Sequence, residues 1–286
     1  MALFFFLTML KGGKWTRSEF REDTDENPLV SVITVTFNAQ LHLAQALDSI
    51  LNQTYSNVEL ILIDGGSTDQ TLNIIKERDH LIDFWQSEPD AGIYDAMNKG
   101  LKLARGRWIA FKNADDWFLP DAIQKFVDCS KNQPGDVYCG HSLSIIQEEP
   151  LVTAPFFTNA NRIGQIPGID HRSCFVRTAM HKLIPFDTTY RLAADLDVFW
   201  RLKKAGGAFI QMNEFMSYKR FGGASDGNII LSECFRINRK NQGATFAIKT
   251  WLSFQAKYYF WKSGNYFLKL LLGDQGYNRF KSRKLR

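Results

Sequence analysis

The chain has 286 residues, of which 45% are hydrophobic and 23% are charged, and its formal net charge is +5. These values are ordinary for a soluble globular protein and too mildly basic to imply nucleic-acid binding. The four cysteines are scattered without a CxxC pair, which argues against a zinc site and a disulfide scaffold and favours a reducing compartment. The length suits one large domain, or a domain with a substantial appendix.

The chain begins with MALFFFLTMLK, whose apolar part of about ten residues is too short to span a bilayer. The segment lacks the basic region and the small-residue cleavage site of a secretory signal, so we expect no such signal. Met1–Leu10 therefore indicates either an interfacial anchor or a misplaced start. The polar residues 16–28 that follow, ending in Pro28, predict a linker.

Apolar runs and amphipathic stripes alternate over about a hundred residues after the linker. Such an alternation requires crossover connections and therefore predicts an α/β fold, with a mainly parallel sheet and helices on both faces. In chain order, the predicted elements are strand 29–37, helix 41–53, strand 58–64, helix 71–78, strand 82–88, helix 93–104, strand 108–111 and a helix from Asp121.

The later part of the chain is less regular. Shorter apolar runs predict a small mixed or antiparallel extension of the sheet. Residues 195–205 predict a helix that stops at Gly206 and Gly207, and the pattern is helical again beyond Ser232. The strands predicted for the extension are 137–146, 151–157 and 171–177.

Polar residues follow three of the predicted strands. Ligands of parallel sheets bind outside the carboxyl ends of the strands, so we expect these polar tips to converge on one binding edge. Acidic residues are concentrated there. The residues at the tips are Thr36, Phe37 and Asn38, then Asp64, then Asn113, Asp115 and Asp116.

Asp115 and Asp116 lie side by side although like charges repel. Two carboxylates in a loop at a binding edge suit Mg²⁺ or Mn²⁺, which take oxygen ligands and complete their shell with substrate phosphates and water. The alternative is a solvated turn, because Asp-Asp is common in turns and Asp121 can cap the next helix. The stretch by itself leaves both interpretations open.

The DGGSTD stretch that begins at Asp64 also has two interpretations. It predicts a tight turn in which Ser67 or Thr68 caps a helix. Alternatively, Asp64 accepts hydrogen bonds from a nucleotide, and the glycines let the backbone approach that ligand closely. No GxGxxG or GxxxxGK(S/T) motif occurs, so neither a dinucleotide fold nor a P-loop is predicted.

The order of SVITVTFN, LIDGGSTD, SEPDAGIYDAMNKG and FKNADD closely resembles the bacterial family 2 glycosyltransferases with a GT-A fold. The resemblance covers about residues 29–225 and is strongest to enzymes of capsule, O-antigen or colanic-acid-type polysaccharide biosynthesis. It implies a Rossmann-like GT-A domain at 29–230. The N-terminal stretch and linker at 1–28 would precede this domain, and a basic and aromatic helical tail at 231–286 would follow it.

The resemblance implies roles for the residues at the sheet edge. Asp116 matches the main metal ligand of a DxD-type motif, and Asp115 matches a residue that contacts ribose or the metal shell. Asp64 matches the first acid of an Asp-Asp-Gly-Ser motif, but Gly65 replaces the second acid, which meets the base. The nucleotide therefore stays open, with UDP favoured over GDP. The implied donor-binding residues are Thr36, Phe37, Asn38, Asp64, Asp90, Asn98, Lys99 and Asp115.

Asp195 stands at the start of a predicted helix, where a carboxylate commonly acts as a cap. The resemblance instead makes Asp195 the catalytic base, with Asp197 as the fallback candidate. His171 matches a residue at the end of a strand, where a structural role and an acceptor-side role are both open. Gly222, Gly223 and Ser225 match a further loop of the family. This loop either closes over the diphosphate or the acceptor, or is a simple flexible turn.

The tail from residue 251 is densely aromatic, has lysines spaced along it, and ends in RFKSRKLR. It predicts either a packed helix with a frayed basic end or a segment that lies on anionic lipid. We favour the second interpretation, because a polymer-building transferase often needs a lipid-linked acceptor. We therefore expect a cytoplasmic protein that is peripheral at the inner face of the cell membrane.

The expected function is inverting, metal-assisted transfer of a sugar from a nucleotide-diphosphate sugar to a saccharide or polyprenyl-linked acceptor in surface polysaccharide biosynthesis. Mg²⁺ or Mn²⁺ would offset the charge of the leaving group, and Asp195 would accept the proton of the acceptor. The alternatives are a sugar-phosphate nucleotidyltransferase and a non-catalytic nucleotide-sugar-binding scaffold at a membrane. The sequence leaves open the donor sugar, the acceptor, the linkage and the oligomeric state.

Overall fold

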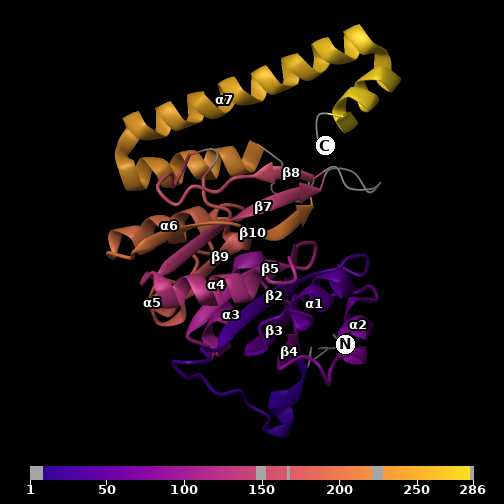
Figure 1. Ribbon diagram of the computed structural model, residues 1–286, viewed down its shortest axis with the longest axis vertical. Coiled ribbons are helices and arrows are strands. Elements are labelled where there is room, and N and C mark those ends of the chain that lie inside the picture. The colour runs from indigo at the N-terminus through magenta and orange to yellow at the C-terminus, as the bar shows by residue number, and fades with distance from the viewer. Residues whose placement is uncertain (1–8, 146–152, 166–167, 221–227, 284–286) are drawn as a thin grey trace, which may run out of the picture.

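The computed structural model of the chain describes residues 9–145, 153–165, 168–220 and 228–283. Within these ranges the chain forms one ten-stranded sheet flanked by helices (Figure 1). This arrangement confirms the α/β fold that the alternating pattern predicts. The helices outside the central crossovers include η1 (Lys14–Arg17), α4 (Ala122–Asn132), α5 (Thr178–Leu183) and α6 (Ala194–Lys204).

Four neighbouring strands form the parallel half of the sheet. The middle strands of this half are buried along their whole length, because helices cover both faces. One apolar core lies between the sheet and α3, and a second lies between the sheet and α1 and α4. The elements are, across the sheet, β4 (Phe84–Ser87), β3 (Val58–Asp64), β2 (Val30–Thr36) and β5 (Trp108–Asn113), with α1 (Leu43–Leu51), α2 (Thr71–Glu77) and α3 (Ile93–Leu103) between them in sequence.

The other half of the sheet is mixed, as the shorter runs predict. Its strands are β9 (Cys174–Arg177), β7 (Val137–Ile145), β10 (Phe209–Arg220), β6 (Trp117–Phe118) and β8 (Thr153–Phe156). β7 and β10 are parallel, whereas β5 with β9, β9 with β7, β10 with β6 and β7 with β8 are antiparallel.

The strand predicted at 171–177 is wrong in its first part. Residues 171–173 form a 3₁₀ helix, η2 (His171–Ser173), and only the rest of that run is a strand. The side chain of Asp170 accepts a hydrogen bond from the backbone N–H of Arg172, which stabilises this turn. As a result, His171 and Arg172 lie in a turn directly before β9 instead of alternating across a sheet.

The segment before the predicted linker and the linker itself, residues 16–28, are both tied to the domain. β1 (Leu10–Gly12) pairs with β4 and extends the sheet by one antiparallel strand. Further along, Arg107 forms ion pairs with Asp23 (3.3 Å) and Asp25 (2.7 Å). The acidic residues that make this segment look like a linker also form its ion pairs with the domain. A polar segment can therefore pack against its domain.

The C-terminal element is α7 (Asn228–Arg283), which lies beyond α6 at the end of the molecule opposite α2 (Figure 1). Gly243 within it has a φ of 84°, in the left-handed region that favours glycine, and α7 turns back on itself in Figure 1. Among the described residues, no helix is both long enough and apolar enough to cross a bilayer.

Candidate active site

The polar tips of the parallel strands lie at one edge of the sheet, as predicted. Thr36 at the end of β2 is paired with Asp64 at the end of β3. The loops beyond these strands are joined, because the Asn38 N–H donates to Ser67 Oγ (2.8 Å) and the Thr68 N–H donates to Asn38 Oδ1 (2.9 Å). The two loops therefore form one continuous rim.

Asp64 shapes this rim from within. Its side chain is fully buried, and its carboxylate accepts hydrogen bonds from the Ser67 N–H (3.0 Å), the Ser67 hydroxyl (2.5 Å) and the Ser87 hydroxyl (2.6 Å). These bonds hold the loop after β3 to the end of β4. Phe37, by contrast, is 63% exposed on the rim. Direct contact of either residue with a donor stays a prediction.

Gly65, where the family motif has its second acid, lies against Asp90. A Cβ atom added at Gly65 would come within 2.6 Å of Asp90 Oδ2, so any side chain there would have to displace that carboxylate. Asp90 accepts a hydrogen bond from the Gly92 N–H (2.8 Å), and burial raises its pKa. The carboxylate at this point of the rim is therefore supplied by Asp90 and not by residue 65.

Asn98 and Lys99, two further predicted donor residues, hold α3 in place in this structure. The Asn98 amide exchanges hydrogen bonds of 2.9 Å with both the N–H and the C=O of Phe186. Lys99 forms ion pairs with Glu88 (2.8 Å) and Asp95 (3.5 Å). Their contacts with a donor stay predictions.

The adjacent aspartates after β5 differ in burial. Asp116 is 1% exposed, whereas Asp115 is half-buried. Asp116 Oδ2 accepts a hydrogen bond from Asn113 Nδ2 (3.2 Å) and lies 3.9 Å from Arg172 Nε. Burial raises the pKa of Asp116 to about 6, and the positive charges of Arg172 and Lys112 oppose that effect.

These residues fit a hard divalent cation. Asn113 Oδ1 is buried and has no hydrogen-bond partner among the described residues, and it lies beside the Asp116 carboxylate. Both groups are oxygen donors of the kind that Mg²⁺ and Mn²⁺ prefer. No cluster of three or more His, Cys, Asp and Glu side chains able to hold a metal occurs in the described part of the chain. A cation here would thus need phosphates or water as further ligands.

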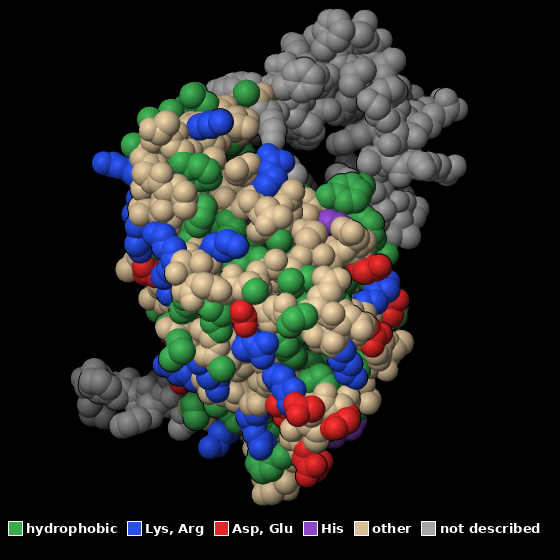
Figure 2. All heavy atoms as spheres, turned by 60° about the vertical axis from the view of Figure 1, so that its left-hand side comes forward, with side chains coloured by type: hydrophobic (Ala, Val, Ile, Leu, Met, Phe, Trp, Pro, Cys, Tyr) green, Lys and Arg blue, Asp and Glu red, His purple; other side chains and the backbone are tan. Residues whose placement is uncertain are grey.

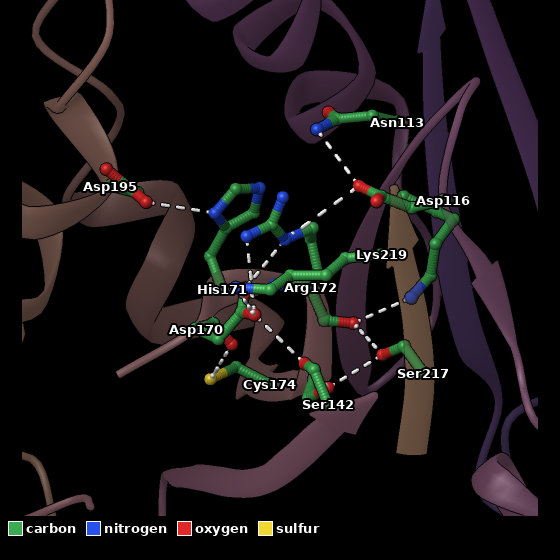
Figure 3. A network of polar contacts seen from close by, with 12 residues as sticks. Asn113, Asp116, Ser142, Asp170, His171, Arg172, Cys174, Asp195, Ser217 and Lys219 are labelled. Atoms are coloured by element: carbon green, nitrogen blue, oxygen red, sulfur yellow. Dashed lines mark hydrogen bonds and ion pairs between the residues drawn. The ribbon is translucent and has the colours of Figure 1, made fainter. Parts of the chain in front are cut away.

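Figure 3 shows a buried network that the sequence analysis missed. Asp170 lies at its centre, with Arg172 Nε at 2.8 Å and Lys219 Nζ at 3.8 Å. Burial alone would raise the pKa of Asp170, but these two cations hold it well below its usual range. Lys112 donates to the backbone carbonyl of Arg172 (2.7 Å), and burial lowers the pKa of this amine to about 7. Asp116 therefore faces a site rich in positive charge.

A signal for two of these missed residues was present in the sequence. Lys112 interrupts the apolar run WIAF before the predicted metal site, and a lysine at the end of a buried strand needs a partner. Arg172 directly follows His171. Asp170 and Lys219 had no comparable signal, because only the pairing of distant segments brings them together.

Asp195 meets His171 at the opposite side of this network (Figure 3). Asp195 Oδ2 lies 2.9 Å from His171 Nδ1, and Asp195 Oδ1 accepts weakly from the Tyr94 hydroxyl (3.4 Å). Burial opposes ionisation of Asp195, but the hydrogen bonds with His171 and the Leu196 N–H keep its pKa below the usual value. Asp195 is therefore an oriented anion at neutral pH. His171 Nε2 is buried and has no hydrogen-bond partner among the described residues.

The helix start beside Asp195 is capped by a different carboxylate. Glu233 of α7 is buried and accepts hydrogen bonds from the N–H groups of Arg191 (2.8 Å), Leu192 (2.9 Å) and Ala193 (3.0 Å). The helix begins at Ala194 with Ala193 as its N-cap residue. Asp195 itself accepts a hydrogen bond from the Leu196 N–H (2.9 Å) in the first turn, so it shares the capping role with Glu233, and its role as a base stays a prediction.

Asp197, the fallback candidate, is engaged elsewhere. It is fully buried and forms ion pairs with Arg201 Nε (2.6 Å) and Lys240 Nζ (3.5 Å). These two cations offset the negative charge of the buried Asp197 carboxylate within the fold. The loop residues Gly222, Gly223 and Ser225 lie outside the described residues, so their predicted role stays a prediction.

Comparison with known proteins identifies the family of this chain. Residues 31–182 match the family model for glycosyl transferase family 2. A glycosyltransferase of PGL/p-HBAD biosynthesis from Mycobacterium bovis BCG is 32% identical over 211 residues, which are 70% of this chain and 80% of the relative. A glycosyltransferase of Haemophilus influenzae is 40% identical over 101 residues, which are 34% of this chain and 40% of the relative.

Solved structures share the fold at lower identity. Staphylococcus aureus TarS 1-349, in complex with UDP-GlcNAc, matches 74% of this chain with a TM-score of 0.61 at 20% identity. The match spans 65% of the TarS chain, slightly less than two thirds. The mannosyltransferase PcManGT from Pyrobaculum calidifontis, in complex with GDP-Man and Mn²⁺, matches 79% of this chain and 68% of its own with a TM-score of 0.55 at 17% identity. Because the family model covers more than half of the chain and the mycobacterial relative matches most of it, this protein belongs to glycosyl transferase family 2.

Proposed function

We propose that this protein transfers a sugar from a nucleotide-diphosphate sugar to an acceptor hydroxyl with inversion at the anomeric carbon, assisted by Mg²⁺ or Mn²⁺. One observation carries the proposal. The adjacent residues His171 and Arg172 contact Asp195 and Asp116 respectively, at 2.9 Å and 3.9 Å. These contacts support the proposal, because they bring the proposed base Asp195 and the proposed cation site at Asp116 to two sides of one short turn.

The reaction follows from these positions. The acceptor oxygen attacks the anomeric carbon and forms a new C–O bond, while the bond from that carbon to the diphosphate oxygen breaks and the nucleotide diphosphate leaves with the electron pair. Asp195 takes the proton of the attacking hydroxyl. His171 orients Asp195 through the hydrogen bond at Nδ1. Because one displacement takes place, the configuration at the anomeric carbon inverts.

The leaving diphosphate accumulates negative charge, which the positive side chains near Asp116 would offset. Arg172 and Lys219 contribute fixed positive charge in this network. Asp116, Asp115 and Asn113 would hold the divalent cation, which supplies Lewis-acid stabilisation of the leaving group when it is bound.

UDP is the favoured nucleotide. Two solved TarS structures of similar fold hold UDP and UDP-GlcNAc, while PcManGT holds GDP-Man, so GDP is the alternative. The rim at Gly65 and Asp90 would meet the base, because it follows β3 at the binding edge.

We also propose a saccharide or polyprenyl-linked acceptor in surface polysaccharide biosynthesis, used by a cytoplasmic protein peripheral to the membrane. Trp251 and Leu252 of α7 are 41% and 54% exposed, and the sequence beyond them ends in the basic run RFKSRKLR. Figure 2 shows hydrophobic and basic side chains side by side at the top of its face, where α7 lies. Such a mixture suits an anionic lipid surface.

Calorimetric titration with UDP tests the donor and cation sites together. We expect binding in the presence of Mn²⁺ to weaken at least about tenfold in EDTA, and equally on Asp116→Asn, which corresponds to about 1.4 kcal/mol. Asp121→Asn is the matched control, because Asp121 lies nearby in sequence, beyond β6, and its ion pair among the described residues is with Lys125 alone. GDP should be titrated in parallel. UDP binding that is unchanged in EDTA and in Asp116→Asn would exclude the cation-assisted mechanism.

A further inference from the structure

A cavity of about 220 Å³ lies between α6, α7 and the segment before η2, and Asp195 forms part of its wall. The rest of the wall is mainly apolar and comes from all of these elements. Trp251 lines the cavity and is also 41% exposed, so the cavity is open to the outside at α7. Apolar side chains that line it include Ile163, Ile169, Phe199, Leu231 and Phe254.

The other polar side chains of the wall already have partners within the protein. Asn238 donates from Nδ2 to the Gly164 carbonyl (3.0 Å) and to the Thr250 hydroxyl (3.2 Å). Gln165 Oε1 accepts from Arg162 (2.9 Å). A sugar ring placed deep in this cavity would exchange its hydrogen bonds to water for few replacements, which costs free energy. The lining therefore favours a hydrocarbon group.

The size of the cavity suits such a group. An apolar cavity of about 150 Å³ is sufficient to bind benzene, so this larger one has room for an aryl ring or a short alkyl or prenyl chain. Asp195 is the end of the wall at which the acceptor hydroxyl must lie when it loses its proton. The group that carries this hydroxyl would then extend into the cavity.

We propose that this cavity binds an apolar aglycone of the acceptor, a hydrocarbon group attached close to the hydroxyl that is glycosylated. The inference rests on the proposed function and narrows its acceptor, because a long, wholly polar saccharide would not use this wall. Entry beside Trp251 and Leu252 of α7 connects the cavity to the surface that we assign to the membrane, where acceptors with hydrocarbon groups are found.

The test measures how the affinity for alkyl β-D-glucopyranosides depends on chain length, from methyl to octyl, below their micelle concentrations and with UDP and Mn²⁺ present. We expect affinity to rise about fourfold for each buried methylene, the usual hydrophobic increment, and to level off once the cavity is full. Equal affinities for the methyl and octyl compounds would overturn the proposal.

Variants that fill the cavity distinguish it from unspecific apolar binding. Cys234→Phe and Leu231→Phe place a ring where the aglycone would lie, and we expect both to lose most of the chain-length dependence. Ile248→Phe is the control, because Ile248 is on the same helix, is 49% exposed and does not line the cavity. Two filling variants are made so that the test can still be carried out if only one of them folds. Full chain-length dependence in a folded filling variant would also overturn the proposal.

UDP titration of the same proteins keeps this inference separate from the proposed function. We expect wild type and all three variants to bind UDP with Mn²⁺ equally well, as the cavity lies on the acceptor side of Asp195. Normal UDP binding with no effect of chain length would reject the cavity inference alone. A wild-type protein that binds neither UDP nor GDP would instead reject the proposed function, and with it the reason for placing an acceptor here.

Discussion

Asp195 has the position of a helix cap but the contacts of an oriented base. The N–H groups that precede α6 are taken by Glu233, and the Asp195 carboxylate contacts His171, the Leu196 N–H and, weakly, the Tyr94 hydroxyl. Its lowered pKa keeps it ionised at neutral pH. A low pKa makes a carboxylate a weaker base, so its catalytic value would come mainly from its position beside the attacking hydroxyl.

Asp195→Asn should separate chemistry from stability. Asparagine keeps the shape of the side chain but cannot take a proton, so we expect kcat for donor-to-acceptor transfer to fall by about 10² or more. The melting temperature and UDP affinity should stay close to wild type. Asp197→Asn should behave in the opposite way, because it removes the charge of a fully buried carboxylate that pairs with the partly exposed Arg201, and we expect a loss of about 3 kcal/mol of stability. An active Asp195→Asn protein would assign the base elsewhere.

The burial of His181 predicts that acid lowers the stability of the fold, an effect that is unrelated to catalysis. It is 2% exposed between Phe111 and Phe186, and burial lowers its pKa from 6.5 to about 4. The unfolded chain therefore binds this proton at a higher pH than the folded chain. The contribution of this group to stability should thus fall as the pH drops from 6.5 towards 4, by about 3 kcal/mol in all.

Urea unfolding at several pH values measures this effect. His181→Leu should flatten the decline of unfolding free energy between pH 6.5 and 4, whatever its stability at pH 7. His80→Leu changes an exposed histidine and should keep the wild-type slope. Equal slopes in the His181→Leu and wild-type proteins would show that another group causes the acid sensitivity.

At the scale of elements, α7 supports α6, the helix that carries the proposed base Asp195. The Glu233 side chain crosses from α7 to three consecutive N–H groups before α6, and Asn238 of α7 accepts a hydrogen bond from Trp200 of α6 (3.1 Å). The first part of α7 is therefore a structural part of the site. The position of Asp195 depends on it, although the two residues lie far apart in sequence.

Glu233→Gln should weaken this connection. Glutamine keeps one oxygen but loses the charge that makes the three hydrogen bonds strong, so we expect a loss of about 2 kcal/mol in unfolding free energy. Because α6 carries Asp195, kcat should fall as well, with UDP affinity nearly unchanged. The control is Glu214→Gln, whose surface ion pair with Lys125 should contribute little. A stable and fully active Glu233→Gln protein would contradict the supporting role of α7.

At the scale of the whole molecule, one sheet joins the proposed donor edge to the proposed acceptor side. β5 ends at Asn113, and Asp115 and Asp116 of the proposed cation site follow it directly; its neighbour β9 follows directly on η2, which carries His171 and Arg172. The chain beyond residue 256 adds a basic and aromatic segment to this catalytic unit. Its clustered basic residues are Arg279, Lys281, Arg283, Lys284 and Arg286.

A chain that ends at residue 256 should separate membrane binding from donor binding. It keeps the cavity wall and Glu233 but lacks the basic cluster, so we expect weaker sedimentation with anionic vesicles and unchanged UDP affinity. High salt should also release the full-length protein, because surface attraction is screened. Equal vesicle binding by the two chains would move the membrane contact to another segment.

Much of the fold and of the site could be predicted from the sequence alone. Strand and helix periods depend on neighbouring residues, so the parallel half of the sheet and its binding edge follow from local patterns. The same holds for the adjacent acids Asp115 and Asp116, whose place after β5 was predicted correctly. Asp195 was singled out through the family resemblance, since its local pattern is equally typical of a cap.

Only the tertiary structure decided how these residues are partnered. Lys112 meets Arg172 across 60 residues of sequence, and Glu233 reaches Ala193 across 40. Such contacts depend on how strands and helices pack, which short-range periodicity does not encode. Packing also shifts the pKa of each group. Burial raises the pKa of Asp116, whereas hydrogen bonds with His171 and the Leu196 N–H lower the pKa of Asp195. The sequence by itself determined which chemical groups are present, and packing decided which of them cap helices, form ion pairs or remain available to a substrate.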